Sequence, residues 1–191
     1  TGALTFSGTL THTRVGGSTL TNNNSAGLTL GNINLSSSSV NREVTFAGSG
    51  DTAVTGVIAD GGTATASSIV LNATGTTLTL SGANTYGGDT TITAGTLLAA
   101  NDTALGADTT GTTVADGATL AFSNNVNSAE AITISGNGVL SGGALRNVSG
   151  NNTNTGNVVL GATSRIQIDS DSSLTLSNID TTFGTRNLVV S

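Results

Sequence analysis

Apolar and polar residues alternate over short segments along the whole chain, usually with a threonine between two apolar residues. The pattern is clearest in LTL from Leu28, VTF from Val44, LTL from Leu78, ITI from Ile132 and LTL from Leu174. A period of two is typical of β-strands with one buried face. Gly, Asn, Asp and Ser separate the segments and predict turns. Because no stretch shows the 3.6-residue apolar period of a helix, we predict an all-β chain with almost no helix.

A five-residue unit, apolar-Thr-apolar-Ser/Ala-Gly, recurs in the sequence. It spans residues 4–8, 44–48, 78–82 and 132–136, and a variant over residues 174–178 ends in Asn178 instead of glycine. Glycine and asparagine tolerate positive φ angles better than other residues do. We therefore interpret the last position of each unit as the end of a strand followed by a turn.

A longer segment is also repeated. The sequence GANTYGGDTTI from Gly82 aligns without gaps with GNNTNTGNVVL from Gly150, which begins 68 residues later. Structural repeats of solenoid proteins run about 20–45 residues. Three windings of about 22–23 residues would account for the separation, although the short units are unevenly spaced and winding length must vary.

A parallel β-helix explains this repetition better than a β-sandwich, which also has many short strands but no expected internal repeat. In a β-helix Leu78 and Leu80 point inward, and Thr77 and Thr79 point outward. We predict one continuous β-solenoid over residues 1–191, with eight or nine windings around a narrow aliphatic interior. Both ends of the chain are strand-like, so we expect it to be a segment of a longer protein.

Composition narrows the functional classes. Charged residues make up 8% of the chain and the net charge is −6. The five positive residues are all arginines and are scattered, so the basic patches that bind nucleic acid or anionic membranes are missing. No apolar run of about 18 residues could span a membrane as a helix. Proline is absent, which fits a chain whose backbone is almost fully paired in ladders, and the absence of cysteine excludes disulfides and thiolate metal sites.

The segment LTLSGANTYGGDTTITAGTL from Leu78 resembles the autotransporter-associated β-strand repeat, also called the passenger-associated transport repeat. The following ALGADTTGTTVADGATLAF resembles the strand pair that usually comes next, so the best match covers residues 78–122. The copy at Gly150 is weaker, because Asn154 stands where Tyr86 does. The residues that carry the motif are Leu78, Leu80, Gly82, Asn84, Tyr86, Gly88, Ile92, Gly95 and Leu97, with Gly150, Asn152 and Gly156 in the second copy.

This resemblance implies a right-handed, single-stranded parallel β-helix in the passenger domain of a bacterial cell-surface or secreted protein. It implies a role in secretion and passenger folding, with an outer-membrane β-barrel expected in the full-length chain. We accordingly expect a non-enzymatic, rigid stalk with a further role in adhesion, self-association or biofilm, and without cofactor, metal or catalytic residues. Expected partners are copies of itself, surface polysaccharide, or the surface of a host or neighbouring cell, and the segment itself is expected to bind no nucleic acid and not to insert into a membrane.

Few side chains are candidates for chemistry. His12 is the only histidine, has no carboxylate near it in sequence, and is expected to be structural rather than a base or metal ligand. The glycine-rich SGNGVLSGG from Ser135 lacks the lysine and helix of a phosphate loop. Tyr86 could stack on a sugar, but the repeat it resembles favours a structural aromatic packed over a turn.

Two functional alternatives remain open: a carbohydrate-active β-helix enzyme or polysaccharide-binding module, and an ice-binding β-solenoid. If Ile166 and Ile168 point inward, Asp169 and Asp171 share an outward face and could serve a carbohydrate-active enzyme or bind Ca²⁺ weakly; a solvated turn is the simpler interpretation. Threonines at alternate positions could form columns like those of ice-binding β-solenoids. The irregular spacing of the threonine pairs in sequence weighs against the regular array that ice binding needs.

Overall fold

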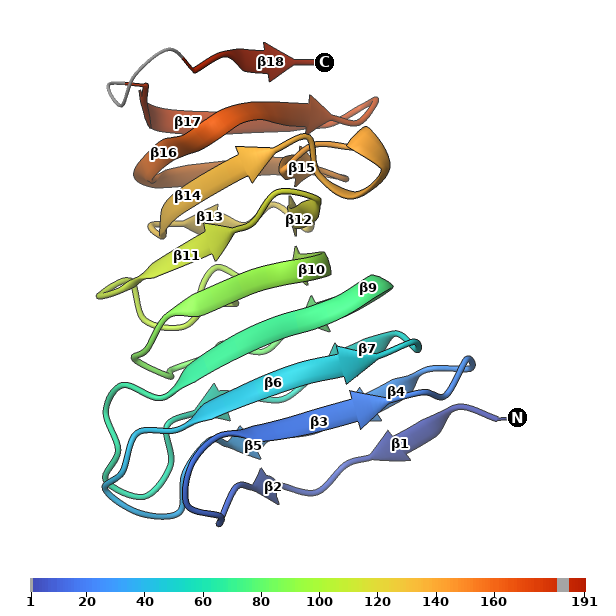
Figure 1. Cartoon of the computed structure of the whole chain (residues 1–191), viewed down its shortest axis with the longest axis vertical. Coiled ribbons are helices and arrows are strands. Elements are labelled where there is room, and N and C mark those ends of the chain that lie inside the picture. The colour runs from blue at the N-terminus through green and yellow to red at the C-terminus, as the bar shows by residue number, and fades with distance from the viewer. Residues whose placement is uncertain (1, 182–185) are drawn as a thin grey trace.

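The computed structural model describes residues 2–181 and 186–191, and in this part of the chain strands are joined by turns without an α-helix (Figure 1). Within these residues a single 3₁₀ turn, η1, spans Val139–Ser141. The strands are β1 (Leu4–Phe6), β2 (Leu10–Thr11), β3 (Ser18–Asn22), β4 (Leu28–Leu30), β5 (Ile33–Asn34), β6 (Glu43–Gly48), β7 (Thr52–Val54), β8 (Ile58–Ala59), β9 (Ser68–Leu80), β10 (Thr90–Ala99), β11 (Gly111–Val114), β12 (Ala118–Phe122), β13 (Asn127–Ser128), β14 (Ala131–Gly136), β15 (Leu145–Asn147), β16 (Asn151–Ile168), β17 (Ser173–Asp180) and β18 (Leu188–Val190).

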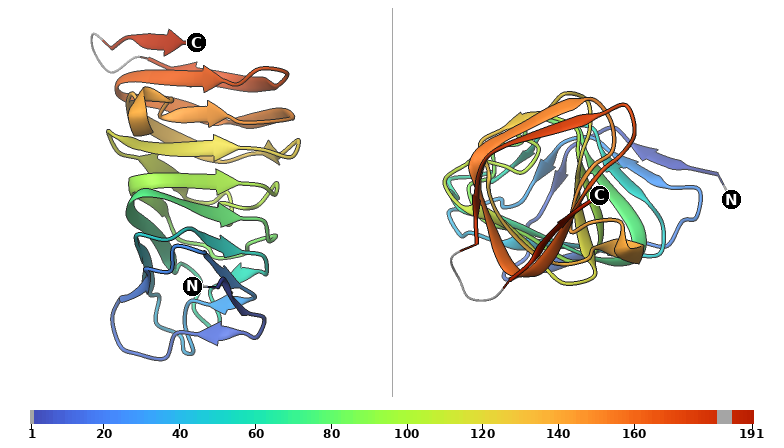
Figure 2. Two further views of the ribbon diagram at one scale, coloured as in Figure 1. Left: turned by 90° about the vertical axis from the view of Figure 1, so that its right-hand side faces the viewer. Right: turned by 90° about the horizontal axis from the view of Figure 1, so that it is seen from above.

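The chain winds upward as a parallel β-solenoid of about eight turns, which confirms the predicted fold. In Figure 1 the front strands β3, β6 and β14 run to the right while the chain climbs from the N-terminus to the C-terminus, so the winding is right-handed. Seen along the axis, the windings enclose a roughly triangular cross-section and are rotated relative to one another (Figure 2). Such rotation is the expected result of strand twist.

Strand pairing places the strands in three rows along the axis. The first row runs through β3, β6, the start of β9 and of β10, β11, β14, and the middle of β16 to the end of β17. The second row runs through β1, β4, β7, the ends of β9 and β10, β12, β15, and the end of β16 to β18. The third row, between these two in chain order, contains β2, β5 and β8 and later β13 with the starts of β16 and β17.

The separation of the two long repeats corresponds to three windings. Ile92 pairs with Val114, Val114 with Ile134, and Ile134 with Leu160. These steps are 22, 20 and 26 residues in the numbering, so the winding length varies while the register of the row is kept. The irregular spacing in the sequence is therefore taken up by the turns and not by the strands.

The interior is a stack of aliphatic side chains that follows the predicted alternation. Leu78 and Leu80 are buried, and Thr77 and Thr79 between them are half-exposed. In the central windings, each interior side chain packs between the aligned side chains of the winding below and the winding above. Full burial of one such side chain contributes about 1.5–3 kcal/mol.

Some of the strands are longer than the sequence pattern indicates. The segments SIVL and TLTL form one strand, β9, and NVVL and RIQI both belong to β16. In β9 the chain bends at Gly75, whose φ is +76°. A residue without a Cβ can take this angle at low cost, so the strand turns a corner while it stays in the ladder.

The interpretation of the five-residue unit is correct for some copies and wrong for others. Gly48 and Gly136 have positive φ, as expected for a turn. A strand, β9, also ends just before Gly82, but φ is not positive there; glycine is needed because a Cβ would lie 1.9 Å from the carbonyl oxygen of Gly56 in the preceding winding. Asn178 lies inside β17, so no strand ends there.

Asparagine and aspartate side chains at the corners bond to the backbone of the next winding. Oδ1 of Asp51 accepts from the N–H of Thr77 at 2.8 Å, and Oδ1 of Asp102 accepts from the N–H of Asn127 at 2.7 Å. Corner residues Asn32, Asn41 and Asn125 accept in the same way. These bonds satisfy backbone donors where the ladder is interrupted, so the corners hold neighbouring windings together.

The stacking of interior side chains predicts a large effect at a central position. Leu97 is fully buried, and Leu97→Ala is expected to lower the free energy of unfolding by about 2–5 kcal/mol because it leaves a cavity in the stack. Urea denaturation measures the change. The matched control is Leu140→Ala: Leu140 is 98% exposed, and its replacement should change stability by less than about 0.5 kcal/mol. Equal effects for the two variants would contradict the stacking account.

Candidate functional site

The repeated asparagines have the same structural role in both copies of the motif. Oδ1 of Asn84 accepts from the N–H of Ile58 at 2.8 Å, and Oδ1 of Asn152 accepts from the N–H of Val126 at 2.6 Å. Both asparagines are buried, and each accepts from a residue 26 positions earlier in the chain. The repeat thus places an inward amide oxygen beside a buried backbone N–H that would otherwise lack a partner. Leaving such a donor without a partner costs about 1–3 kcal/mol.

The remaining motif residues also serve the fold. Ile92 and Leu97 belong to the interior stack with Leu78 and Leu80. The glycines Gly88, Gly95 and Gly156 lie so close to carbonyl oxygens of the preceding winding that a Cβ would be 2.1–2.5 Å away, and Gly150 has a φ of +81° beside Asn125. The motif therefore specifies how one winding fits on the next.

Tyr86 is completely buried, so it offers no exposed ring on which a sugar could stack. Its hydroxyl hydrogen-bonds the hydroxyl of Thr90 at 2.6 Å. Its ring lies against Gly106, where a Cβ would be 2.7 Å from Cε2. The predicted packing of an aromatic over a turn is correct, and burial raises the pKa of Tyr86 well above its usual value.

Asn154 takes the place of Tyr86 in the second copy and is equally buried. Its Nδ2 donates to the carbonyl oxygens of Glu130 at 3.0 Å and Gly156 at 3.1 Å, while its Oδ1 is buried without a protein partner. Both residues therefore fill the solenoid interior at equivalent positions, one with a ring and one with an amide. This exchange makes the interior near the C-terminus more polar.

Glu130 is the buried acid that the sequence did not identify as a candidate. It is 3% exposed, and its Oε1 accepts from the hydroxyl of Thr112 at 2.8 Å. Burial raises the pKa of Glu130 to about 7, the bond from Thr112 opposes the rise, and the charges of Asp108 and Asp89 add to it. No sequence signal marks this residue, since its burial depends on the windings above and below.

Glu130 also lines the pocket that comes nearest to an active-site arrangement. This pocket, of about 310 Å³, lies at the corner before β14, and its lining includes Asn84, Asp102, Asp108 and Ser128. A carboxylic acid with a raised pKa in a pocket can act as a general acid, and a second carboxylate can assist it. In the described residues, no group of three or more His, Asp or Glu side chains is arranged to hold a metal ion.

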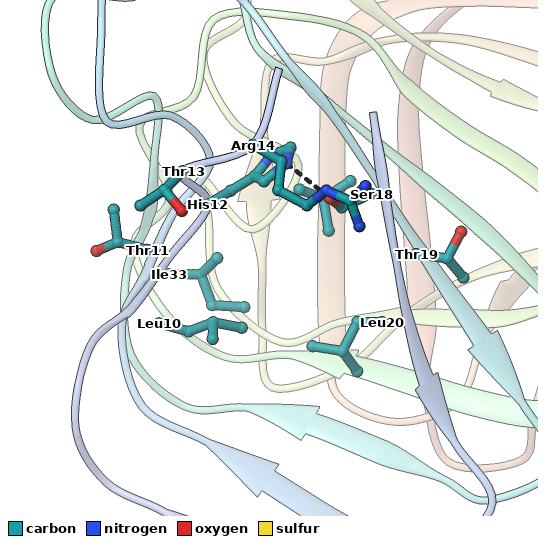
Figure 3. Close-up of a pocket in the computed structure, with 10 residues that line it drawn as sticks. Leu10, Thr11, His12, Thr13, Arg14, Ser18, Thr19, Leu20 and Ile33 are labelled. Atoms are coloured by element: carbon teal, nitrogen blue, oxygen red, sulfur yellow. Dashed lines mark hydrogen bonds between the residues drawn. The ribbon is translucent and has the colours of Figure 1, made fainter. Parts of the chain in front are cut away.

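A second pocket, of about 340 Å³, opens at the N-terminal end of the solenoid (Figure 3). It is lined by apolar residues of the first two windings, including Leu10, Leu20 and Ile33. His12 lies at its edge, with Nε2 2.6 Å from the Ser18 hydroxyl and Nδ1 3.2 Å from the carbonyl oxygen of Leu35. The histidine thus links the first winding to the second, in keeping with the expected structural role.

Asp169 and Asp171 do not share a strand face, and the simpler interpretation, a turn after the strand, is the correct one. β16 ends at Ile168, and Asp171 lies in a turn with a φ of +60°. Asp169 instead accepts two hydrogen bonds from Arg146, at 3.0 and 2.8 Å. The hydrogen bond to Asp169 is the main cause that raises the pKa of Arg146. The structure therefore does not bring the two aspartates together as a pair.

Arg42 shows that the scattered arginines are not all solvated. It is 7% exposed, and it donates from Nε to Ser36 at 3.0 Å and from Nη2 to Ser38 at 3.2 Å. The serines that precede Arg42 therefore bind its buried guanidinium at a corner.

The glycine-rich segment from Ser135 also has a structural role. It forms a loop around η1, in which the N–H of Val139 donates to the hydroxyl of Thr119 at 2.9 Å.

One outward column is in register although its residues are irregularly spaced in the sequence, and threonine occupies five of its seven positions. In the first row the outward residues align as Thr19, Thr45, Val70, Thr91, Thr113, Thr133 and Val159. The column is regular because the ladder sets its spacing at about 4.8 Å, whatever the length of the corners. The rotation between windings turns this column gradually around the axis (Figure 2).

Comparison with protein-family models, with curated proteins and with solved structures gave no match. Within the described residues, no helix has the length and apolarity needed to cross a membrane.

The raised pKa of Glu130 predicts how stability changes with pH. The folded chain holds a proton on Glu130 up to about pH 7, whereas the unfolded chain releases it near pH 4.5, so folding becomes less favourable as the pH rises between these values. The loss is at most about 3 kcal/mol. Glu130→Gln cannot ionise and should be more stable than the parent at pH 8 but not at pH 4, in urea denaturation. An unchanged difference between the two proteins across this range would contradict the burial of an ionisable carboxyl.

Proposed function

We propose that this chain is a non-enzymatic, rigid segment of a bacterial cell-surface or secreted autotransporter-like protein. The observation that carries the proposal is the interior stack, in which the apolar residues of the first row pass through successive windings in register. With about eight turns spaced about 4.8 Å apart, the solenoid is a rod on the order of 40 Å long. A stalk needs this kind of stiffness along one axis.

The motif residues support the same proposal. In both copies they provide the close glycine contacts and inward asparagines that fix one winding on the next. Such a repeat lets windings form one after another, because each contacts only its neighbours. Sequential folding suits a passenger that leaves the cell as an unfolded chain, and the absence of cysteine prevents premature disulfides.

Surface display tests the proposal directly. The chain is placed between a secretion signal and an outer-membrane β-barrel in a Gram-negative host, and external protease is added to intact cells. We expect a displayed segment that resists the protease. The matched variant Leu97→Asp puts a charge into the stack and should be displayed less or digested, whereas Leu140→Asp should behave as the parent. Failure of the parent chain to reach the surface in a resistant form would contradict the proposal.

Two observations favour other functions and allow them to be tested. The Glu130 pocket favours a carbohydrate-active enzyme. Such an enzyme would release new reducing or unsaturated ends from a panel of polysaccharides, and Glu130→Gln would lose this activity.

The threonine column favours ice binding. Ice binding would give thermal hysteresis, which Thr113→Tyr would abolish and Thr109→Tyr, outside the column, would not. For a structural stalk we expect no products and no hysteresis at high protein concentration. Either signal with its variant dependence would replace the stalk proposal.

A further inference from the structure

The corner between the first and second strand rows is much longer in one winding than in the winding before it. Residues 115–117 separate β11 from β12, whereas residues 137–144 separate β14 from β15. The longer loop, which contains η1, projects from the rod beside β14 and β15 (Figure 1). Thr119 of β12 is aligned with the outward Thr96 but is only 3% exposed, because this loop folds over it.

The loop holds an unusual backbone conformation that presents a leucine to solvent. Leu140 and Ser141 have φ angles of +50° and +60°, which are costly for residues with a Cβ. The hydroxyl of Thr119 fixes the loop, since it accepts from the N–H of Val139 at 2.9 Å and donates to the carbonyl oxygen of Gly143 at 2.8 Å. Leu140 is nevertheless 98% exposed, so packing of its side chain within the chain does not explain the strain.

A groove of about 610 Å³ lies beside this loop. It crosses four successive windings at the same corner, and its lining comes from residues 74–77, 93–96, 116–117 and 138–140. With windings about 4.8 Å apart, the groove extends about 14 Å along the rod. Other windings pack on both sides of these four, so the shape of the groove does not depend on either end of the chain.

The free polar groups of the groove are hydroxyls and one carboxylate. Thr77 and Thr96 are aligned one winding apart in the ladder. Within the described residues, the hydroxyls of Thr74, Thr77 and Thr96 and the carboxylate of Asp116 make no hydrogen bond to another residue. Leu140 adds apolar surface at the rim. The groove therefore offers donors and acceptors in a row, beside one aliphatic side chain.

This lining excludes several classes of ligand. No arginine or histidine lines the groove, so nothing in it would neutralise a nucleic acid, a phosphate or an acidic polysaccharide. β9 and β10 are paired on both sides, so they offer no free edge to which a peptide strand could be added. Val139 and Leu140 are the only lining side chains with the apolar bulk that a helix needs, and two are too few to hold its apolar face.

We propose that this groove binds a neutral polysaccharide that lies along the rod axis, with its hydroxyls on Thr77, Thr96 and Asp116 and one sugar face against Leu140. In an extended β-1,4-linked chain, successive sugar units repeat at nearly the spacing of the windings, so each unit meets the next winding. The lining has no aromatic ring, so binding at one groove is weak. The inference goes beyond the stalk role and does not depend on it.

Titration with neutral oligosaccharides tests the proposal. The isotope-labelled chain is titrated with cellohexaose, mannohexaose and xylohexaose and followed by NMR. For at least one of these sugars we expect the amide signals of Gly75, Gly95, Gly117 and Leu140 to shift with one dissociation constant. Hexagalacturonate has the same length but carries carboxylates, and it should bind at least about tenfold more weakly.

Matched double variants separate the groove hydroxyls from other surface threonines. Thr77→Val combined with Thr96→Val removes two free hydroxyls of the groove and should weaken binding about tenfold. Thr91→Val combined with Thr113→Val makes the same change outside the groove and should leave binding unchanged. Leu140→Asp alters an exposed position, so it should stay folded and still lose affinity. The NMR spectrum of each variant shows whether it is folded.

The outcomes distinguish this groove from the stalk function. No shift with any of the three neutral sugars, shifts confined to other surfaces, equal binding of hexagalacturonate, or equal effects of the two double variants would overturn the proposal. A chain that is displayed and protease-resistant but binds none of these sugars would refute the groove and leave the stalk function standing. Binding by a chain that is not displayed would do the reverse.

Discussion

The parallel backbone ladder between successive windings is the constraint on which the rest of this structure depends. It places residues one winding apart directly above each other, as in the series Ile92, Val114, Ile134 and Leu160. Once this alignment is fixed, alternation of apolar and polar residues in the sequence is enough to produce an apolar interior and aligned outer columns.

The corners keep the strand rows in register, which equal winding lengths would do in a more uniform solenoid. Windings differ in length, yet the rows stay in register because turns of different size are closed by side chains that reach the next winding. Asp51, Asp102 and Asn125 each satisfy a backbone N–H of the next winding. Glycines such as Gly82 remove the Cβ where two backbones approach. An irregular sequence can therefore build a regular rod.

The fold could be predicted from the sequence because its two determinants are local. Alternation around Leu78 and Leu80 marks the buried face, and the copies at Gly82 and Gly150 mark the repeat. The candidate sites were predicted less well, because burial at a corner depends on residues about twenty positions away. No local pattern marks Glu130 and Arg42 as buried. The sequence also could not show that Asp169 binds Arg146 of the preceding winding and does not share a strand face with Asp171.

Register along the first strand row tests the central claim most directly. The chain has no cysteine, so spin labels can be placed at chosen positions without background. Labels at Thr45 and Thr133 are four windings apart in the column, and labels at Thr19 and Val159 are six apart. Double electron–electron resonance should give separations of about 19 and 29 Å, because each winding adds about 4.8 Å. Equal distances for the two pairs, or a shorter distance for the outer pair, would contradict the stacked windings.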